Sequence, residues 1–219
     1  MERGAHPVAA SGLWTRPGTY DRAIVRDSEL YLELDPGPAD VLLDLGANIG
    51  AVTSLFLERG ARHVVAVEPE PRNFELLLLN TAACDGRVTT LNVAVAGERG
   101  VRSLWVHPGP NRGAHSIAMQ KSAVSCLVPC RTLAELVETY EPTLLKIDVE
   151  GAEYELLDSL ATLPRCIRGV AIELHFDKPD WRLRLAPRLI ASLERQGFVP
   201  TEPPELTGRA RTLVTWLRR

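Results

Sequence analysis

Short apolar runs alternate with stretches of helical spacing along the chain, and this alternation constrains the fold more than any other feature. Seven runs are typical of buried strands: residues 41–46, 63–69, 88–95, 142–149, 169–175, 197–200 and 212–219. Patterns typical of helices occupy residues 49–58, 71–82, 132–140, the stretch after 151, and 183–196. Strands that alternate with helices indicate an α/β fold, in which a mostly parallel sheet carries helices on both faces.

The stretch LLKIDVEGAEYELL, residues 144–157, ends a buried strand in acidic residues. Alternate side chains of an extended chain share a face, so Lys146, Asp148 and Glu150 point to the same side. A lysine within a buried strand needs a carboxylate nearby, and we expect the neighbouring strand to supply it. After Gly151 the apolar residues recur every four positions, which predicts that a helix follows the strand directly.

Length, charge and cysteine content restrict the class of protein. The chain has 219 residues, enough for one sizeable α/β domain, and its net charge of −3 predicts no nucleic-acid partner. No apolar run approaches the ~20 residues that span a bilayer, and the amino terminus lacks a signal-peptide pattern, so we expect a cytoplasmic protein without membrane contact. Cys126 and Cys130 could share a strand face and reach a metal, but nothing completes a zinc ligand set.

Two segments differ in composition from the alternating pattern. Residues 1–38 are rich in Gly, Pro and polar residues, and we expect an amino-terminal arm that forms a cap or substrate region. The main domain is expected over residues 39–219. Within it, residues 97–125 are too long for an ordinary connection, so we expect an insertion in which a short strand at Trp105 pairs with the run SCLVPC.

The first predicted strand leads into a glycine-rich turn, and the second ends in an acidic residue. Gly46 and Gly50 would let the backbone turn tightly and approach a ligand at the start of a helix, although such turns also need glycine for structural reasons. Glu68 is suited to bind the two hydroxyls of a ribose. Asp44 would repel a pyrophosphate and attract an ammonium group. These residues predict a nucleoside site for a cationic ligand, and S-adenosylmethionine fits.

The motifs over residues 40–176 resemble those of the FkbM-type methyltransferases, which use S-adenosylmethionine. The resemblance rests on LLDLGANIGAVTSLF, VVAVEPEPRNFELLLLN, LNVAVAGERG, RTLAELV, LLKIDVEGAEYELL and VAIELH, in this order. It implies a Rossmann-like class I methyltransferase fold with a seven-stranded, mostly parallel sheet. It also implies contacts to the methionine part of the cofactor for Asp44, Gly46, Asn48 and Gly50, to the ribose for Glu68, and to the adenine region for Asn92 and Ala94.

The acidic end of the fourth strand lies beside the first strand in this fold. Asp148 is therefore expected next to Asp44 and the sulfonium end of the cofactor. Methyl transfer needs a positioned nucleophile, and a neutral hydroxyl also needs a base. The residues that could serve as the base are Asp148, Glu150, Glu173 and His175, with His115 in the insertion as an outsider. His175 is the first choice because histidine titrates near neutral pH, although it could instead hydrogen-bond a loop at the sheet edge.

The acidic residues of this region could also bind a metal or stabilise a helix. Asp148, Glu150 and Glu173 could present oxygen ligands to Mg²⁺, but the chain offers no unambiguous set of three converging acids, so a metal is not favoured. Glu153 falls in the first turn of a predicted helix, where the helix dipole stabilises a carboxylate. We therefore expect no resident metal and a structural role for Glu153.

The sequence predicts an O-methyltransferase that acts on a hydroxyl of a small molecule, a sugar or a polyketide-like metabolite of natural product biosynthesis. Two alternatives stay open: an N- or carboxyl-methyltransferase of a small molecule or peptide natural product, and a non-catalytic nucleoside-binding module. An NAD-dependent reductase is disfavoured because the third glycine of a dinucleotide turn and a Tyr-x-x-x-Lys pair are missing. Apolar residues near Trp216 are consistent with a homodimer interface or with a final strand packed against the sheet.

Overall fold

One seven-stranded sheet forms the centre of the molecule in the computed structural model, which describes residues 6–7, 12–84, 86–120, 122–176, 181–206 and 211–218. Its strands lie in the order β11-β12-β10-β9-β3-β4-β5. Their bounds are Val41–Leu45 (β3), His63–Val67 (β4), Val88–Leu91 (β5), Leu144–Ile147 (β9), Gly169–His175 (β10), Phe198–Pro200 (β11) and Arg211–Arg218 (β12). The five strands from β10 to β5 run parallel, and β12 is antiparallel to both of its neighbours. The predicted seven-stranded, mostly parallel sheet is confirmed.

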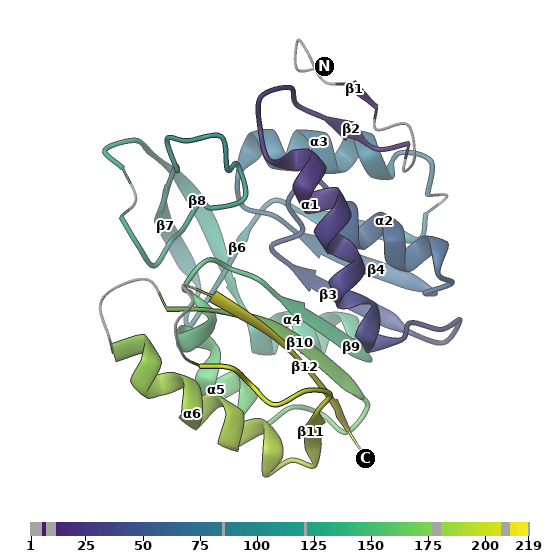
Figure 1. Cartoon of the computed structure of the whole chain (residues 1–219), viewed down its shortest axis with the longest axis vertical. Coiled ribbons are helices and arrows are strands. Elements are labelled where there is room, and N and C mark those ends of the chain that lie inside the picture. Colours follow the sequence, from purple (N-terminus) through teal and green to yellow (C-terminus); the bar gives the residue numbers. More distant parts are fainter. Residues whose placement is uncertain are drawn as a thin grey trace.

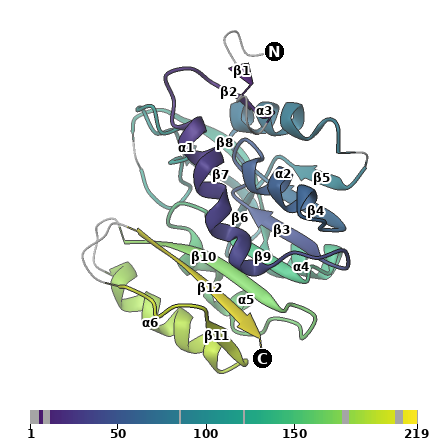
Figure 2. The ribbon, with the colours of Figure 1, turned by 45° about the vertical axis from the view of Figure 1, so that its right-hand side comes forward.

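Helices cover both faces of this sheet (Figures 1 and 2). One face is covered by α1 (Asp21–Asp27), the 3-10 helix η1 (Ser28–Leu34), α2 (Ala51–Glu58) and α3 (Pro71–Thr81). The other face is covered by α4 (Leu133–Tyr140), η2 (Glu153–Leu156), α5 (Leu157–Leu160) and α6 (Trp181–Glu194). The helix predicted after residue 151 is thus a 3-10 turn followed by one short α-helix. Within the described residues, no helix has the length and apolar character needed to cross a membrane.

The alternation of side chains along each strand divides the core into two layers. On β3, Leu43 and Leu45 pack with α4 and α6, whereas Leu42 packs with η1 and α2. All three leucines are fully buried, because a central parallel strand is covered on both faces. Trp216 of β12 is also buried in the first of these layers. The final strand therefore packs against the sheet, which is one of the two interpretations that the sequence left open for the apolar residues near Trp216.

A second, three-stranded sheet stands above the carboxyl edge of the first. Its strands are β6 (Ala94–Ala96), β7 (Gly100–Trp105) and β8 (Ser125–Thr132). The predicted pairing of the insertion is confirmed, since Trp105 lies opposite Ser125 in an antiparallel ladder. The single strand predicted over residues 88–95 is wrong, because β5 and β6 belong to different sheets. The chain turns at Asn92, whose amide donates to the carbonyl oxygens of Glu68 and Pro69 at 2.8 and 3.2 Å.

The amino-terminal arm is fastened to the main domain by polar contacts. A short ladder of β1 (His6–Pro7) and β2 (Trp14–Thr15) precedes α1. The side chain of Asn80 on α3 exchanges hydrogen bonds with both backbone groups of Trp14, at 2.6 and 3.1 Å. Arg16 binds the buried carboxylate of Asp21 and also donates to Asn73 of α3 at 2.8 Å. These contacts hold α1 beside the carboxyl edge of the sheet, where Ile24 and Asp27 line a cavity.

Candidate active site

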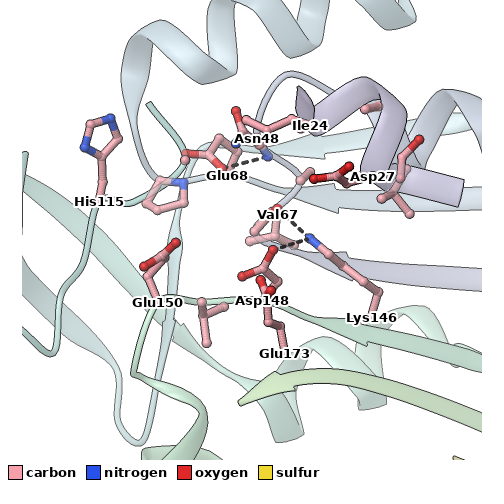
Figure 3. A pocket seen from close by; sticks show the side chains of 18 of the residues that line it. Ile24, Asp27, Asn48, Val67, Glu68, His115, Lys146, Asp148, Glu150 and Glu173 are labelled. Atoms are coloured by element: carbon pink, nitrogen blue, oxygen red, sulfur yellow. Dashed lines mark hydrogen bonds and ion pairs between the residues drawn. The ribbon is translucent and has the colours of Figure 1, made fainter. Parts of the chain in front are cut away.

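A cavity lies at the carboxyl edge of the sheet, between the arm and the insertion (Figure 3). The strand ends and the loops that follow them supply Gly46, Asn48, Glu68, Ala94, Lys146, Asp148, Glu150, Glu173 and Arg211. The arm adds a wall that includes Tyr20, Ile24, Asp27 and Tyr31, and the insertion adds Asn111, Gly113, His115 and Ile117. Ligand sites of open α/β sheets lie at this edge, so the cavity is where a binding site is expected.

The glycine turn after β3 forms the floor beside the acidic strand end. Gly46 has φ +80°, and a Cβ atom on it would lie 1.9 Å from the backbone oxygen of Asp148. No other residue type fits there without moving the loop after β9. Asn48 also has a positive φ, +52°, and its buried side-chain oxygen has no hydrogen-bond partner among the described residues. The turn therefore brings backbone and an unsatisfied acceptor close to the cavity.

Glu68, which follows β4, lies across the cavity from Asp148 and Glu173 in Figure 3. One of its oxygens accepts the backbone N–H of Asn48 at 2.8 Å, and the other accepts that of Glu70 at 2.9 Å. Burial raises the pKa of Glu68 to about 7 against the opposite effect of these hydrogen bonds. Its Oε1 also accepts a hydrogen bond from Asn73 Nδ2 at 3.4 Å. Glu68 therefore titrates near neutral pH, and its Oε2, which accepts the N–H of Asn48, retains a lone pair for a ligand.

Lys146 lies beneath the floor and binds two acids and the glycine turn. Its Nζ is 3.1 Å from Asp44 Oδ1, the residue directly opposite on β3, and 3.9 Å from Asp148 Oδ2. It also donates to the carbonyl oxygen of Gly46 at 2.6 Å. Burial alone would lower the pKa of Lys146, but the two carboxylates raise it above its ordinary value. The carboxylate expected beside this lysine is therefore supplied by the neighbouring strand, as predicted.

Three carboxylates gather at the ends of β9 and β10: Asp148, Glu150 and Glu173. Burial and the Asp148 charge raise the pKa of Glu173 to about 8, although Arg211 binds its Oε1 at 2.9 Å. Burial alone would raise the pKa of Asp148, but Lys146 and His175 lower it. Glu150 has φ +52°, an uncommon backbone conformation for a glutamate, and such conformations concentrate at functional sites.

His175 lies beneath these carboxylates and is not part of the cavity wall. Only 3% of it is exposed, and its Nδ1 lies 2.9 Å from Oε1 of the fully buried Glu153. Burial alone would lower the pKa of His175, but Glu153, Glu150 and Asp148 raise it to about 10. His175 therefore lies outside the lining of the cavity, and without a competing cation the surrounding acids favour its protonated form at neutral pH. This placement contradicts its predicted role as the base.

Three predicted cofactor residues also lie behind the wall. Asp44 is fully buried, bound to Lys146 and to the Thr53 hydroxyl at 2.7 Å. Gly50, with φ +84°, packs against Leu77 at the start of α2. Asn92 shapes the backbone after Glu68 and does not reach the cavity. None of the three is among the residues that line the cavity, and each contacts residues that shape its wall.

Tyr31 carries no recognisable local signal of the site in the sequence, and the contacts of Glu153 and His115 go beyond what the sequence predicts. The hydroxyl of Tyr31 in the arm donates to Asp148 Oδ2 at 3.3 Å, across 117 positions of sequence. Glu153, expected to serve only a helix dipole, also accepts the N–H groups of Val149 and Gly151 at 3.2 and 3.1 Å. His115 does line the cavity, but its Nδ1 accepts the backbone N–H of His107 at 2.9 Å and is not available as a base.

Comparisons with known proteins identify relatives of the chain. Residues 44–200 match the family described as the methyltransferase FkbM domain. The hexuronic acid methyltransferase AglP of Haloferax volcanii is 29% identical over 136 residues. That alignment covers 62% of this chain and 56% of AglP, so the chain spans little more than half of its curated relative.

Solved structures of similar fold include two with a TM-score of 0.50. One is the Escherichia coli protein yhhF, described as a candidate methyltransferase, at 13% identity with 98% of each chain covered. The other is the fibrillarin pre-rRNA processing protein of Methanococcus jannaschii, at 12% identity with 83% of this chain and 67% of that one covered. These likenesses show the Rossmann-like fold of the chain.

Proposed function

We propose that this chain, which belongs to the FkbM methyltransferase family and is a methyltransferase, moves the methyl group of S-adenosylmethionine to a hydroxyl of a small, sugar-like molecule. The observation that carries the proposal is the acidic wall of Asp148, Glu150 and Glu173, which faces the glycine turn across one cavity. Carboxylates at that position can bind and deprotonate a hydroxyl. The relative named for a hexuronic acid, itself a polyhydroxylated sugar acid, supports this class of acceptor.

The residues around the glycine turn fit S-adenosylmethionine. The backbone of Gly46 lines the floor, Asn48 has a buried oxygen without a partner among the described residues, and Glu68 Oε2 has a lone pair suited to a ribose hydroxyl. When bound, the cofactor supplies a methyl group on a positively charged sulfur. We assign the methionine part to Gly46, Asn48 and Asp148, the ribose to Glu68, and the adenine to the apolar strip at Ala94. Asp44, Gly50 and Asn92 support these residues from behind.

Glu150 is the residue that we assign as the base in place of His175. It lines the cavity, whereas His175 does not. Asp148 lies beside Lys146, Glu173 binds Arg211, and Glu150 Oε1 lies 3.7 Å from His175 Nε2, so each of the three carboxylates faces a basic side chain. Glu150 differs from the other two in its strained backbone conformation, with φ +52°. In this scheme Glu150 takes the proton of the acceptor hydroxyl, while Asp148 and Glu173 orient the acceptor.

The arm and the insertion form the walls that we assign to the acceptor. Ile24 and Ile117 give this part of the cavity apolar surface, and Asn111 and His115 give it polar groups. A wall of mixed polarity suits a ring with hydroxyls on its rim. The arm over residues 1–38 and the insertion over residues 97–125 would therefore select the acceptor, and the sheet would hold the cofactor.

Calorimetric titration with S-adenosylmethionine and S-adenosylhomocysteine tests the proposal. We expect both to bind the full chain with micromolar dissociation constants, and we expect Gly46→Ala to weaken both at least tenfold because its Cβ displaces the loop at Asp148. Formation of S-adenosylhomocysteine is then measured with glucuronate and glucose as acceptors. Absence of binding would refute the cofactor assignment, and binding without turnover on any hydroxylated acceptor would favour the non-catalytic nucleoside module.

Cofactor affinity should depend on pH through Glu68. With a folded-state pKa of about 7, this carboxyl is mostly protonated at pH 6 and ionised at pH 8. The ionised form accepts ribose hydroxyls better, so S-adenosylhomocysteine should bind up to roughly tenfold more tightly at pH 8 than at pH 6. The Glu68→Gln variant is the control and should lose this dependence. Equal pH dependence in both proteins would show that another group is responsible.

A further inference from the structure

We propose that Asp148, Glu173 and His175 form a binding site for one divalent transition-metal ion at the acidic wall of the cavity. One ligand atom from each of these residues can be chosen so that all three lie within 4.8 Å of one another. The sequence alone offers an all-oxygen set for Mg²⁺, from Asp148, Glu150 and Glu173, without three unambiguously converging acids. The folded chain adds an imidazole nitrogen, which changes the kind of metal that the donor set suits.

Each carboxylate of this set divides its two oxygens between a basic side chain and His175. Asp148 Oδ2 lies 3.9 Å from Lys146 Nζ, while Oδ1 lies 3.9 Å from His175 Nε2. Glu173 Oε1 binds Arg211 at 2.9 Å, while Oε2 lies 3.8 Å from the same Nε2. One oxygen of each acid is thus fixed by the protein, and the other is directed at a common point.

The separations around Nε2 suit an ion and do not suit hydrogen bonds. Distances of 3.8 and 3.9 Å between Nε2 and the two oxygens exceed the ~3.2 Å limit of an ordinary hydrogen bond. Two ligands of one ion with bonds of about 2.1 Å lie at most about 4.2 Å apart, so the measured separations are within reach. Nε2 is also fully buried and has no hydrogen-bond partner among the residues that the structure describes.

His175 is oriented as a metal-binding histidine usually is. Its Nδ1 lies 2.9 Å from Glu153 Oε1, and the backbone N–H groups of Val149 and Gly151 hold the same oxygen. A carboxylate on one imidazole nitrogen directs the other nitrogen at the ion and strengthens it as a ligand. Glu153, which the sequence assigned only to a helix dipole, therefore acts in this site as the residue that orients His175.

The charge of the surroundings leaves room for a cation. Five carboxyl groups gather here, against three basic groups: the ammonium of Lys146, the guanidinium of Arg211 and the imidazole of His175, whose Nε2 proton a bound ion would displace. The carboxyl groups belong to Asp44, Asp148, Glu150, Glu153 and Glu173. Two carboxylates with one imidazole suit Mn²⁺ or Zn²⁺ better than Mg²⁺, which prefers oxygen and water. The ion would polarise an acceptor hydroxyl next to Glu150, and this part of the inference rests on the proposed function.

The binding test uses Mn²⁺ alone with the full chain after removal of metals by a chelator. The hexaaquo Mn²⁺ signal in electron paramagnetic resonance measures the free ion during titration. We expect one bound Mn²⁺ per chain, with affinity at least tenfold weaker in Glu173→Gln and in His175→Gln. The matched control is Asp27→Asn, a cavity acid of the arm outside the set, which should bind Mn²⁺ like the parent chain.

Two further readouts decide the inference. Nitrogen modulation in the pulsed electron paramagnetic resonance spectrum of bound Mn²⁺ should be present in the parent chain and lost in His175→Gln. If His175→Gln does not fold, the Mn²⁺ affinity of Glu173→Gln is the deciding measurement. Equal Mn²⁺ affinity in the parent and Glu173→Gln would overturn the site. Binding of S-adenosylhomocysteine to the metal-free chain is measured in parallel, so failure of the metal site and failure of the cofactor assignment give different results.

Discussion

Replacement of Lys146 by methionine is expected to lower the free energy of unfolding by about 3–5 kcal/mol. Methionine fills a similar volume but removes the charge that lies 3.1 Å from the fully buried carboxylate of Asp44. Asp44 would keep only the hydroxyl of Thr53, and the Gly46 carbonyl would lose its donor. Unfolding in urea, followed by circular dichroism in a buffer with chelator, measures the loss.

Two variants make this measurement specific. Arg26→Met removes an exposed cation whose pair with Asp27 lies at the surface, so it should change stability by less than about 0.5 kcal/mol. The double variant Asp44→Asn with Lys146→Met removes both charges, so it should be more stable than Lys146→Met alone. If the free energy of unfolding of Lys146→Met were within about 1 kcal/mol of the parent value, the ion pair with Lys146 would not be what stabilises the buried carboxylate of Asp44.

Replacement of Glu150 by glutamine is expected to lower turnover by roughly 10²–10⁴-fold, the usual contribution of a general base. The amide has nearly the same shape as the carboxylate but cannot take the acceptor proton. Glu150 is not among the residues assigned to the cofactor, so the affinity for S-adenosylmethionine should stay within about twofold. Initial rates of S-adenosylhomocysteine formation and calorimetry on the same preparations separate the two effects.

Glu155→Gln is the matched control for this variant. Glu155 lies in η2, shortly after Glu150 in the sequence, but its side chain binds Arg102 and does not line the cavity. Its replacement should therefore leave turnover near that of the parent. Parental turnover in Glu150→Gln would remove Glu150 from the mechanism. If Asp148→Asn and Glu173→Gln also kept parental turnover, the acceptor would be a group that needs no base, and carboxyl methylation would replace O-methylation.

The sheet could be predicted because each of its strands has a strong local pattern. Strand β3, for example, is covered on both faces, and its residues Leu42, Leu43 and Leu45 are fully buried. A continuous apolar run in the sequence is typical of such a strand. The turn at Asn92 could not be predicted in the same way. The run over residues 88–95 has the pattern of one strand, and only the hydrogen bonds from the Asn92 amide to the loop after β4 divide it between two sheets.

The location of the candidate site could be predicted from the sequence, whereas most partners of its individual side chains could not. The sequence predicts that a neighbouring strand supplies a carboxylate to Lys146, and the observed register places Asp44 opposite it. A sequence cannot tell, however, whether a carboxylate binds a ligand or another side chain, and Asp44 binds Lys146. His175 shows the same limit, because its distance from the cavity depends on how the loop at Glu153 packs over it.

The cavity is bounded by segments that lie far apart in the sequence, and this has a consequence for how the protein folds. Tyr20 in the arm donates its backbone N–H to the carbonyl of Pro110 in the insertion, and Tyr31 reaches Asp148. The β3–β9 ladder of the sheet joins residues at a similar separation, so sequence distance alone does not decide whether the sheet or these contacts form first. The two contacts lie outside the ladders of the sheet. A chain with a native sheet is therefore not yet a chain with a complete cavity.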